Sequence, residues 1–390
     1  MKGSLKVYLL ALVSFLVGTS EYVISGILDK ISLSLDISIT STGQLVTIFS
    51  LIYAICTPVV MALTARVERQ KLLVAGLAVF VIANLLAFLL PGYELFVASR
   101  ALMALGAGTV VVSALDIASK IAPEGKKASS IANVTMGFTM SLIIGVPLGR
   151  MITAEFGWRA VFGLLALAGL LIMVVLYFTI PRVKGDAPMP LSRQLGFLKN
   201  SRVAFGLAIT FFWLGGYSIA YTYISPYLLS VAGLGENMLS SVLLAFGIAS
   251  LIGSKSGGYS TDKWGVARTL TGGMLLHAAA LILLTVAVMF THSWVPVVVI
   301  LMLWSFAAWS TGPTQQYNMV RIEPQYSSVM LSLNQSTMQL SMAAGAGLGG
   351  IVIDQVSLSH VTWVGAFSVL IAFAASLFLH AKMKMKENVA

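Results

Sequence analysis

The residue best placed to do chemistry is an acid, Glu21, inside the otherwise uncharged run FLVGTSEYVISGIL (15–28). The charge-free stretch begins after Lys6 and, apart from this acid, continues to Asp29 and Lys30. A helix of that length crosses a hydrocarbon core of about 30 Å, which takes roughly 20 residues. Acids at such a depth are costly, rare and usually functional. The run therefore predicts a membrane span with a functional carboxylate inside it.

The composition of the whole chain is that of an integral membrane protein. Hydrophobic residues make up 58% of the 390 residues and charged residues only 10%, whereas a soluble domain carries about 25% charged residues. Cys56 is the single cysteine, which excludes an intramolecular disulfide and a cysteine-rich metal site. The first apolar segment is too long for the core of a signal peptide, so we expect it to be a retained helix.

Apolar runs of helical length recur along the chain and predict twelve transmembrane helices. They lie near residues 6–28, 43–63, 71–90, 95–118, 129–152, 158–180, 203–229, 238–258, 267–290, 294–317, 328–353 and 361–381. An even number of spans places both termini on one side of the membrane. The fold class that we expect is an all-α integral membrane protein.

The basic residues predict which side that is. With both termini in the cytoplasm, 20 of the 24 Lys and Arg residues fall in the inner loops and tails, as the excess of positive charge in cytoplasmic loops requires. The formal net charge of +10 is therefore a topology signal. We expect a multi-pass protein of a bacterial-type cytoplasmic membrane that does not bind nucleic acid.

The longest connection, PRVKGDAPMPLSRQLGFLKNSRV (181–203), divides the spans into two sets of six. It contains three prolines and five basic residues. We expect an N-terminal six-helix bundle over 1–181, a cytoplasmic loop over 182–202 and a C-terminal six-helix bundle over 203–390.

The two sets of spans are similar to each other in sequence. Four identities recur at an offset of 201 residues, namely Ile121 with Ile322, Pro123 with Pro324, Asn133 with Asn334 and Gly149 with Gly350. Transporters are often built from repeated bundles. The pattern therefore favours two pseudo-symmetric bundles within one chain.

Two loops carry a family resemblance. The sequence GGYSTDKWGVAR (257–268) resembles the G-x-L-A-D-R-x-G-R-K loop of the major facilitator superfamily. Four of its residues are in register: Gly258, Asp262, Lys263 and Gly265. The equivalent loop of the first half, MALTARVERQK (61–71), has Ala65 in place of the acid but keeps Arg66 and Arg69. The resemblance implies a gating role for these loops.

Two spans extend the resemblance to the twelve-helix drug:proton antiporter branch. ASRALMALGAG (98–108) is similar to the motif R-x-x-q-G-x-G through Arg100. GVPLG (145–149) resembles the antiporter motif G-P-x-x-G, shifted by one inserted valine, and supplies Gly145, Pro147 and Gly149. Within this branch, EYVISGIL (21–28), GVPLG (145–149) and WSTGPTQQ (309–316) look like efflux permeases that export purine nucleosides, sugars or chloramphenicol-like drugs.

The resemblance implies that spans 1, 4, 7 and 10 line a central cavity. Glu21 and Arg100 then lie at similar depths, roughly 10 Å below the outer surface by helical rise, and could meet. Burial favours the neutral acid and a guanidinium favours the ionised one, so Glu21 could load and release a proton. The alternative is a permanent structural bridge. Asp116 is a further coupling candidate, although a surface pair with Lys120 explains it equally well.

Substrate contacts are expected from aromatic and amide side chains that face the cavity. The candidates are Tyr22, Asn133, Trp213, Tyr217, Tyr221, Trp304, Trp309, Gln315, Gln316, Asn334 and Gln339. Trp213, Tyr217 and Tyr221 recur every four residues and form one stripe. The alternative for these aromatic residues is an interface belt or helix packing.

His277 is the only histidine well inside a span, and we expect it to hydrogen-bond between helices rather than to relay protons. No second ligand stands at metal spacing beside it. No catalytic set and no nucleotide-binding loop appears, so we expect neither an enzyme nor an ATP-driven pump.

The function that these observations predict is proton-coupled export of a small organic molecule by a monomeric carrier, with protons as the coupling ion and no other cofactor. A proton symporter that imports a small metabolite is the alternative. A channel is less consistent with the duplication, because channels usually assemble their selectivity element from several subunits.

Overall fold

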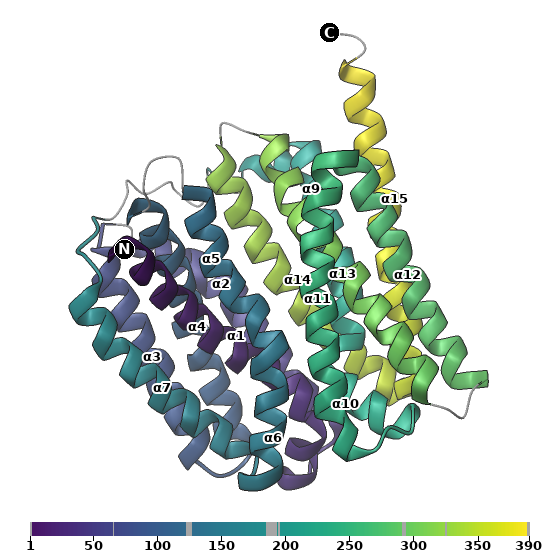
Figure 1. Ribbon diagram of the computed structural model, residues 1–390, viewed down its shortest axis with the longest axis horizontal. Coiled ribbons are helices and arrows are strands. Elements are labelled where there is room, and N and C mark those ends of the chain that lie inside the picture. The colour runs from purple at the N-terminus through teal and green to yellow at the C-terminus, as the bar shows by residue number, and fades with distance from the viewer. Residues whose placement is uncertain are drawn as a thin grey trace. The chain divides into compact units, whose positions relative to one another are not determined.

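The computed structural model describes residues 2–64, 66–121, 127–184, 193, 196–290, 294–323 and 326–387. Twelve of its helices are long and apolar enough to cross a membrane, and the described residues contain no strand (Figure 1). The prediction of an all-α, twelve-span membrane protein is confirmed. Ala65, Pro123 and Pro324 lie outside the described residues.

The chain divides into two compact units. The first consists of Met1–Ser38 and Ile48–Pro190, and the second of Ile39–Thr47 and Leu191–Ala390. One helix, α2, therefore contributes its first nine residues to the second unit and the remainder to the first. We describe each unit by itself.

The first unit contains six spans, of which the fifth is interrupted. Its elements are α1 (Lys2–Leu35), most of α2 (Ile39–Leu63), α3 (Arg69–Leu89), α4 (Tyr93–Ile121), α5 (Lys127–Met140), the π-helical turn η1 (Ser141–Gly145), α6 (Val146–Phe156) and α7 (Trp158–Thr179). Helix α3 packs against α4 and α7, and α1 packs against α5, η1 and α6. The sequence placed the end of the first span at residue 28, but α1 continues to Leu35.

The second unit contains the other six spans. Its elements are η2 (Phe197–Lys199), α9 (Ser201–Tyr221), α10 (Ile224–Pro226), η3 (Tyr227–Val231), α11 (Glu236–Trp264), α12 (Val266–Phe290), α13 (Trp294–Ile322), α14 (Ser327–Gln355), η5 (Leu358–His360) and α15 (Val361–Glu387). Helix α13 packs against both α11 and α12, and α9 packs against α14 and α15 (Figure 1). The seventh span was predicted to reach residue 229, but the backbone leaves the helical conformation at Tyr223.

Glycines bring the fifth span into close contact with α1. A Cβ atom at Gly145 would collide with the side chain of Thr19, and one at Gly149 would collide with Val23. Small residues at such positions let two helix backbones approach closely, which is a common way for membrane helices to associate. The antiporter-like motif therefore forms a helix interface within the first unit.

The same interface recurs in the second unit between α14 and α9. A Cβ atom at Gly345 would lie 2.7 Å from the Gly215 carbonyl oxygen. One at Gly349 would lie 2.9 Å from the Ile219 carbonyl oxygen and 2.6 Å from the ring of Tyr223, just after α9 ends. Gly345 and Gly349 follow their counterparts in the fifth span by 200 residues. The contacts thus support the internal repeat and assign Gly349, not Gly350, as the counterpart of Gly149.

The π-helical turn η1 explains why the offset differs from 201. Gly18 faces Ser141 in the first unit, and Ser218 donates a hydrogen bond of 3.0 Å to the Met342 carbonyl in the second. Gly18 of α1 and Ser218 of α9 are 200 residues apart, whereas their partners, Ser141 and Met342, are 201 residues apart. Four residues later, Gly145 and Gly345 are again 200 residues apart. A π turn adds one residue to a helix, so η1 accommodates the residue that the sequence shows as an insertion in the motif.

Candidate functional site

The acid predicted to be functional is buried inside the first unit. Glu21 in α1 is 2% exposed. Its carboxylate lies close enough to the Arg100 guanidinium of α4 and to the Tyr53 phenol of α2 for electrostatic interaction. The structure therefore brings Glu21 and Arg100 together, as their equal depths suggested. Tyr53 was not anticipated, because nothing in the spacing of the second span distinguishes it.

Arg100 is completely buried and only partly hydrogen-bonded. Its Nη1 donates to the Ser20 carbonyl at 2.7 Å and to the Met103 sulfur at 3.8 Å. The guanidinium carbon lies 4.2 Å from the ring centroid of Phe49, which is a cation–π contact. Nε and Nη2 find no hydrogen-bond partner within the described part of the chain. A buried cation of this kind is costly without a nearby negative charge, which Glu21 supplies.

The apolar surroundings strengthen this interaction. Phe49 and Met103, which contact the guanidinium, are both fully buried, and charges attract more strongly where the dielectric is low. Protonation of the acid would remove the attraction and leave the cation to find another partner.

Asp116 lies in a separate cluster at the other end of α4. Its Oδ2 accepts from Lys120 Nζ at 3.0 Å, which confirms the expected pair, and lies 2.7 Å from Nε of the buried Arg69. The Arg69 amide donates to the Val183 carbonyl, and Lys120 Nζ donates to the Lys184 carbonyl. These contacts hold the chain after α7 against the end of α4.

The structure separates Asp116 from the buried acid. Asp116 follows Arg100 by about 24 Å along α4 at the helical rise. Arg66, another basic residue of the first motif loop, is exposed. Asp116 and Glu21 are therefore not parts of one site in the first unit.

A further ion pair links α1 to α6. Arg150 pairs with Asp29, and its Nη1 also donates to the Gly26 carbonyl at 3.4 Å. The backbone at Ile27 is not helical (φ −126°, ψ 15°), which marks a kink next to that carbonyl. The sequence ended the first span at residue 28, just before Asp29, but α1 continues past this residue and the aspartate is paired inside the unit.

The predicted aromatic stripe is a packed cluster in the second unit. The rings of Tyr217 and Tyr221 stack at 5.0 Å, and Trp304 lies 5.5 Å from Tyr217. Phe246 of α11 stacks on Tyr221 and also contacts Trp304, which the sequence did not indicate. Trp309 is partly exposed, and its indole nitrogen donates to the Tyr217 hydroxyl at 3.4 Å. Of this cluster, Trp309 is the member that remains accessible.

His277 completes the cluster from α12. It is fully buried, with its ring 6.5 Å from that of Tyr217 and 6.3 Å from that of Trp304. Neither ring nitrogen has a hydrogen-bond partner among the described residues. The expectation that this histidine hydrogen-bonds between helices is wrong, because its neighbours present ring faces and edges rather than polar atoms. Trp213 is buried nearby on α9.

Predicted amide residues form a second buried group in the second unit. Gln315 Nε2 donates to the Gly206 carbonyl at 2.7 Å and to Thr210 Oγ1 at 2.8 Å. Thr210 in turn donates to Asn334 Oδ1 at 2.6 Å, and Asn318 donates to Gln315 Oε1 at 3.1 Å. The chain of bonds links α9, α13 and α14, so these amides hold three helices in register.

The remaining substrate candidates differ in accessibility. Gln339 is buried, whereas Tyr22, Asn133 and Gln316 are partly exposed.

Pro147 lies in the first turn of α6, directly after the π turn.

The second motif loop ends α11 and starts α12. Gly265 caps α11 with φ of 84°, a left-handed conformation that favours glycine. Lys263 lies with its Nζ 5.7 Å from the ring centroid of Tyr259. Gly258 lies on α11, where Asp262 is exposed. Within the described residues, no group of three or more His, Cys, Asp or Glu side chains is arranged to hold a metal ion.

The chain is similar to known proteins over most of its length. The family model of the Major Facilitator Superfamily matches residues 10–326. The chain is 62% identical over 379 residues to the uncharacterized MFS-type transporter YbcL of Bacillus subtilis, covering 97% of this chain and 96% of the relative. It is 28% identical over 391 residues to the inner membrane transport protein YdhP of Escherichia coli, covering 100% and 99% of the two chains.

Solved structures share the fold. A bacterial homolog of the human lysosomal transporter Spinster matches with a TM-score of 0.75 and 16% identity, covering 97% of both chains. A D-xylose-proton symporter matches with a TM-score of 0.77 and 16% identity, covering 96% of both chains. At this identity the likeness concerns the fold alone.

Proposed function

The chain belongs to the Major Facilitator Superfamily, and from this we propose that it is a proton-coupled carrier that exports a small organic molecule. Membership makes it a multi-pass membrane transporter rather than an enzyme. The direction of transport, the coupling ion and the substrate class are the parts that we propose.

The observation that carries the proposal is the buried carboxylate of Glu21 beside the buried guanidinium of Arg100. In our scheme, outward opening hydrates Glu21 and lets it take up a proton, which weakens its attraction to Arg100. Inward opening releases the proton to the cytoplasm, and substrate binds while Glu21 is ionised. Each conformation must bind the proton with a different affinity, since only such a difference couples a ligand to a conformational change.

The proposed substrate is neutral or weakly polar. The aromatic residues around Tyr217 and the partly exposed Trp309 favour a molecule with a planar or apolar part. We place the protein in the bacterial cytoplasmic membrane as a monomer with cytoplasmic termini. This placement agrees with the basic inner loops, and the YdhP relative of Escherichia coli is an inner membrane transport protein.

The test is transport by purified protein in proteoliposomes with an imposed pH gradient. Nucleosides, sugars and chloramphenicol-like molecules are scanned for substrate-induced proton movement, and the wild type is compared with Glu21→Gln. Glu94→Gln is the matched control, because Glu94 is an exposed acid in the first turn of α4. We expect coupled movement in the wild type and in the control, and its loss in Glu21→Gln.

Two results would contradict the proposal. Equal substrate flux and equal proton movement in Glu21→Gln and the wild type would make the acid structural. Protons and substrate moving in the same direction would identify a symporter and overturn export.

A further inference from the structure

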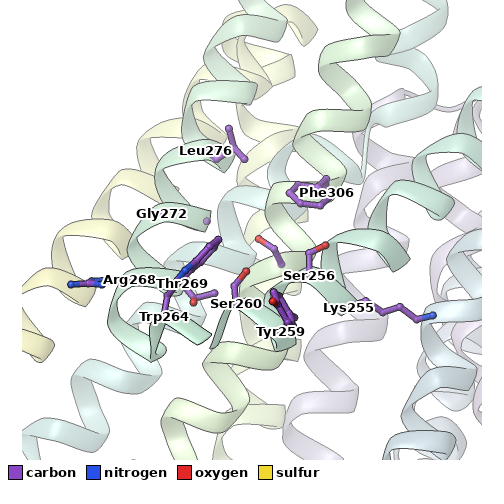
Figure 2. A pocket seen from close by; sticks show the side chains of 13 residues that line it. Lys255, Ser256, Tyr259, Ser260, Trp264, Arg268, Thr269, Gly272, Leu276 and Phe306 are labelled. Atoms are coloured by element: carbon purple, nitrogen blue, oxygen red, sulfur yellow. The ribbon is translucent and has the colours of Figure 1, made fainter. Parts of the chain in front are cut away.

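An open groove runs between two helices of the second unit. Helices α11 and α12 both pack against α13 and leave about 650 Å³ between them, which Figure 2 shows from close by. Small residues make this room: Ser256, Gly257, Ser260, Gly272 and Gly273. A Cβ atom at Gly272 would meet nothing within 4 Å, so the groove is open at that point. Its volume is in the range of ordinary ligand sites.

Along α12 the lining of the groove changes from basic to apolar. Arg268 and Trp264 line it where α12 begins, and Leu276 and Phe306 line it further along (Figure 2). Leu276 follows Arg268 by about 12 Å along α12 at the helical rise. A ligand that fills the groove therefore needs a polar head near Arg268 and an apolar part that extends toward the middle of the span.

The charge of the lining is positive. Lys255 and Arg268 extend from opposite rims, and the residues that line the groove include no acid (Figure 2). Lys263 adds a third cation close to the rings of Tyr259 and Trp264, which are 63% and 55% exposed. Exposed Trp and Tyr side chains beside basic residues are typical of the membrane interface. The beginning of α12, a helix of 25 residues, also favours a negative charge.

We infer that this groove binds an anionic phospholipid, with the phosphate beside Arg268 and one acyl chain lying along Gly272 toward Leu276 and Phe306. Basic pockets between transmembrane helices on the cytoplasmic side bind acidic headgroups, and this end of the second unit is the one predicted to be cytoplasmic. The inference is independent of the coupling role proposed for Glu21, because the site lies wholly within α11, α12 and α13.

Native mass spectrometry of the detergent-solubilised full chain tests the inference. The probes are phosphatidylglycerol, phosphatidylcholine with the same acyl chains, and inorganic phosphate. We expect phosphatidylglycerol adducts on the wild type that survive activation. Lys255→Gln and Arg268→Gln should each reduce these adducts by about five-fold, as expected for one basic residue at an acidic membrane surface. Arg321→Gln, which removes an exposed cation from the end of α13, is the control that should retain them.

A second pair of variants tests the position of the acyl chain. Gly272→Leu fills the open point of the groove, whereas Gly272→Ala adds a single methyl group. We expect Leu to abolish the adduct and Ala to keep most of it. All variants are first checked for an unchanged elution volume and melting temperature, so that lost binding is not mistaken for lost folding.

Three results would overturn the inference. Equal binding of phosphatidylcholine would show that charge is not recognised. Displacement of the lipid by inorganic phosphate at equal concentration would indicate a site for a free anion. Equal adducts on Gly272→Leu and the wild type would place the lipid elsewhere.

Discussion

The first and second units share a backbone arrangement but carry different side chains at equivalent positions. Helices α1 and α9 correspond at an offset of 200 residues, as the glycine contacts of the fifth and eleventh spans show. At this offset Glu21 in the first unit corresponds to Tyr221 in the second. The acid interacts with a buried guanidinium, whereas the tyrosine stacks between Tyr217 and Phe246.

This difference shows how the two halves of a duplicated fold can take different roles. The repeat keeps the close helix packing, which depends on small residues, while the side chains at equivalent positions are free to differ. In our proposal the first unit holds the proton and the second recognises the substrate. The predictions below test this division, beginning with the largest expected effect.

Arg100→Met should destabilise the first unit by about 3–5 kcal/mol, because it leaves the Glu21 carboxylate buried without its cation. The double variant Glu21→Gln/Arg100→Met should recover much of that loss, since it removes both charges. Unfolding in detergent, followed by melting temperature and denaturant titration, measures both values. A double variant that is no more stable than Arg100→Met would show that the two charges do not depend on each other.

Trp309→Ala should weaken substrate affinity about ten-fold while the ratio of protons to substrate stays the same. The partly exposed indole combines an apolar face with a hydrogen bond to Tyr217, and an aromatic contact of this type contributes about 1–2 kcal/mol. Binding to purified protein and the coupling ratio in proteoliposomes are the two measurements. Tyr217→Phe is the matched control, because it removes only the hydroxyl that accepts the indole hydrogen bond.

A change in the coupling ratio of Trp309→Ala would break the proposed division between the units, since it would give the second unit a part in proton transfer. Unchanged affinity in Trp309→Ala would remove this residue from the substrate site.

Asp116→Asn should lower stability by about 1–2 kcal/mol and leave proton coupling intact. Its pair with Lys120 is partly exposed and contributes little, but its other partner, Arg69, is buried and would lose its anion. Loss of the aspartate should also loosen the chain near Val183, which hydrogen exchange of residues 180–184 can measure. Loss of proton coupling in this variant would show that the first unit has two coupling acids.

The sequence predicted the architecture because membrane spans are long, apolar and separated by charge. Twelve apolar runs of helical length were sufficient for the fold class. The π turn η1 was visible only as an inserted residue in a motif, because the same apolar residues fit an α-helix and a π-helix equally well. Its position became clear from the contacts of Ser141 and Met342.

The candidate site was predictable only where a residue type was unusual for its surroundings. Glu21 and Arg100 stand out in apolar spans, and their interaction follows from equal depth. Tyr53, Phe49 and Phe246 complete the two sites, but aromatic residues are common in membrane helices and have no distinguishing spacing. Which neighbour a buried side chain meets depends on helix rotation, which a single sequence does not determine.

His277→Phe should have the smallest effect, a change of less than about 1 kcal/mol in stability. Neither ring nitrogen of His277 has a hydrogen-bond partner in the described part of the chain, and replacing a buried polar group by an apolar ring of similar shape is nearly neutral or stabilising when no bond is lost. The ring would still pack against Tyr217 and Trp304, so the aromatic cluster should keep its form. His277→Ala is the contrasting variant, because it removes the ring and leaves a cavity, and it should cost several times more.

The same substitution compares the two units directly. If the first unit alone handles protons, the pH profile of transport by His277→Phe should superimpose on that of the wild type, whereas the profile of Glu21→Gln should lose its dependence on pH. A shift of the profile in His277→Phe with unchanged stability would mean that the histidine binds a proton during the cycle. The second unit would then hold a titrating group inside its aromatic cluster, and the difference between the units would be one of degree rather than of kind.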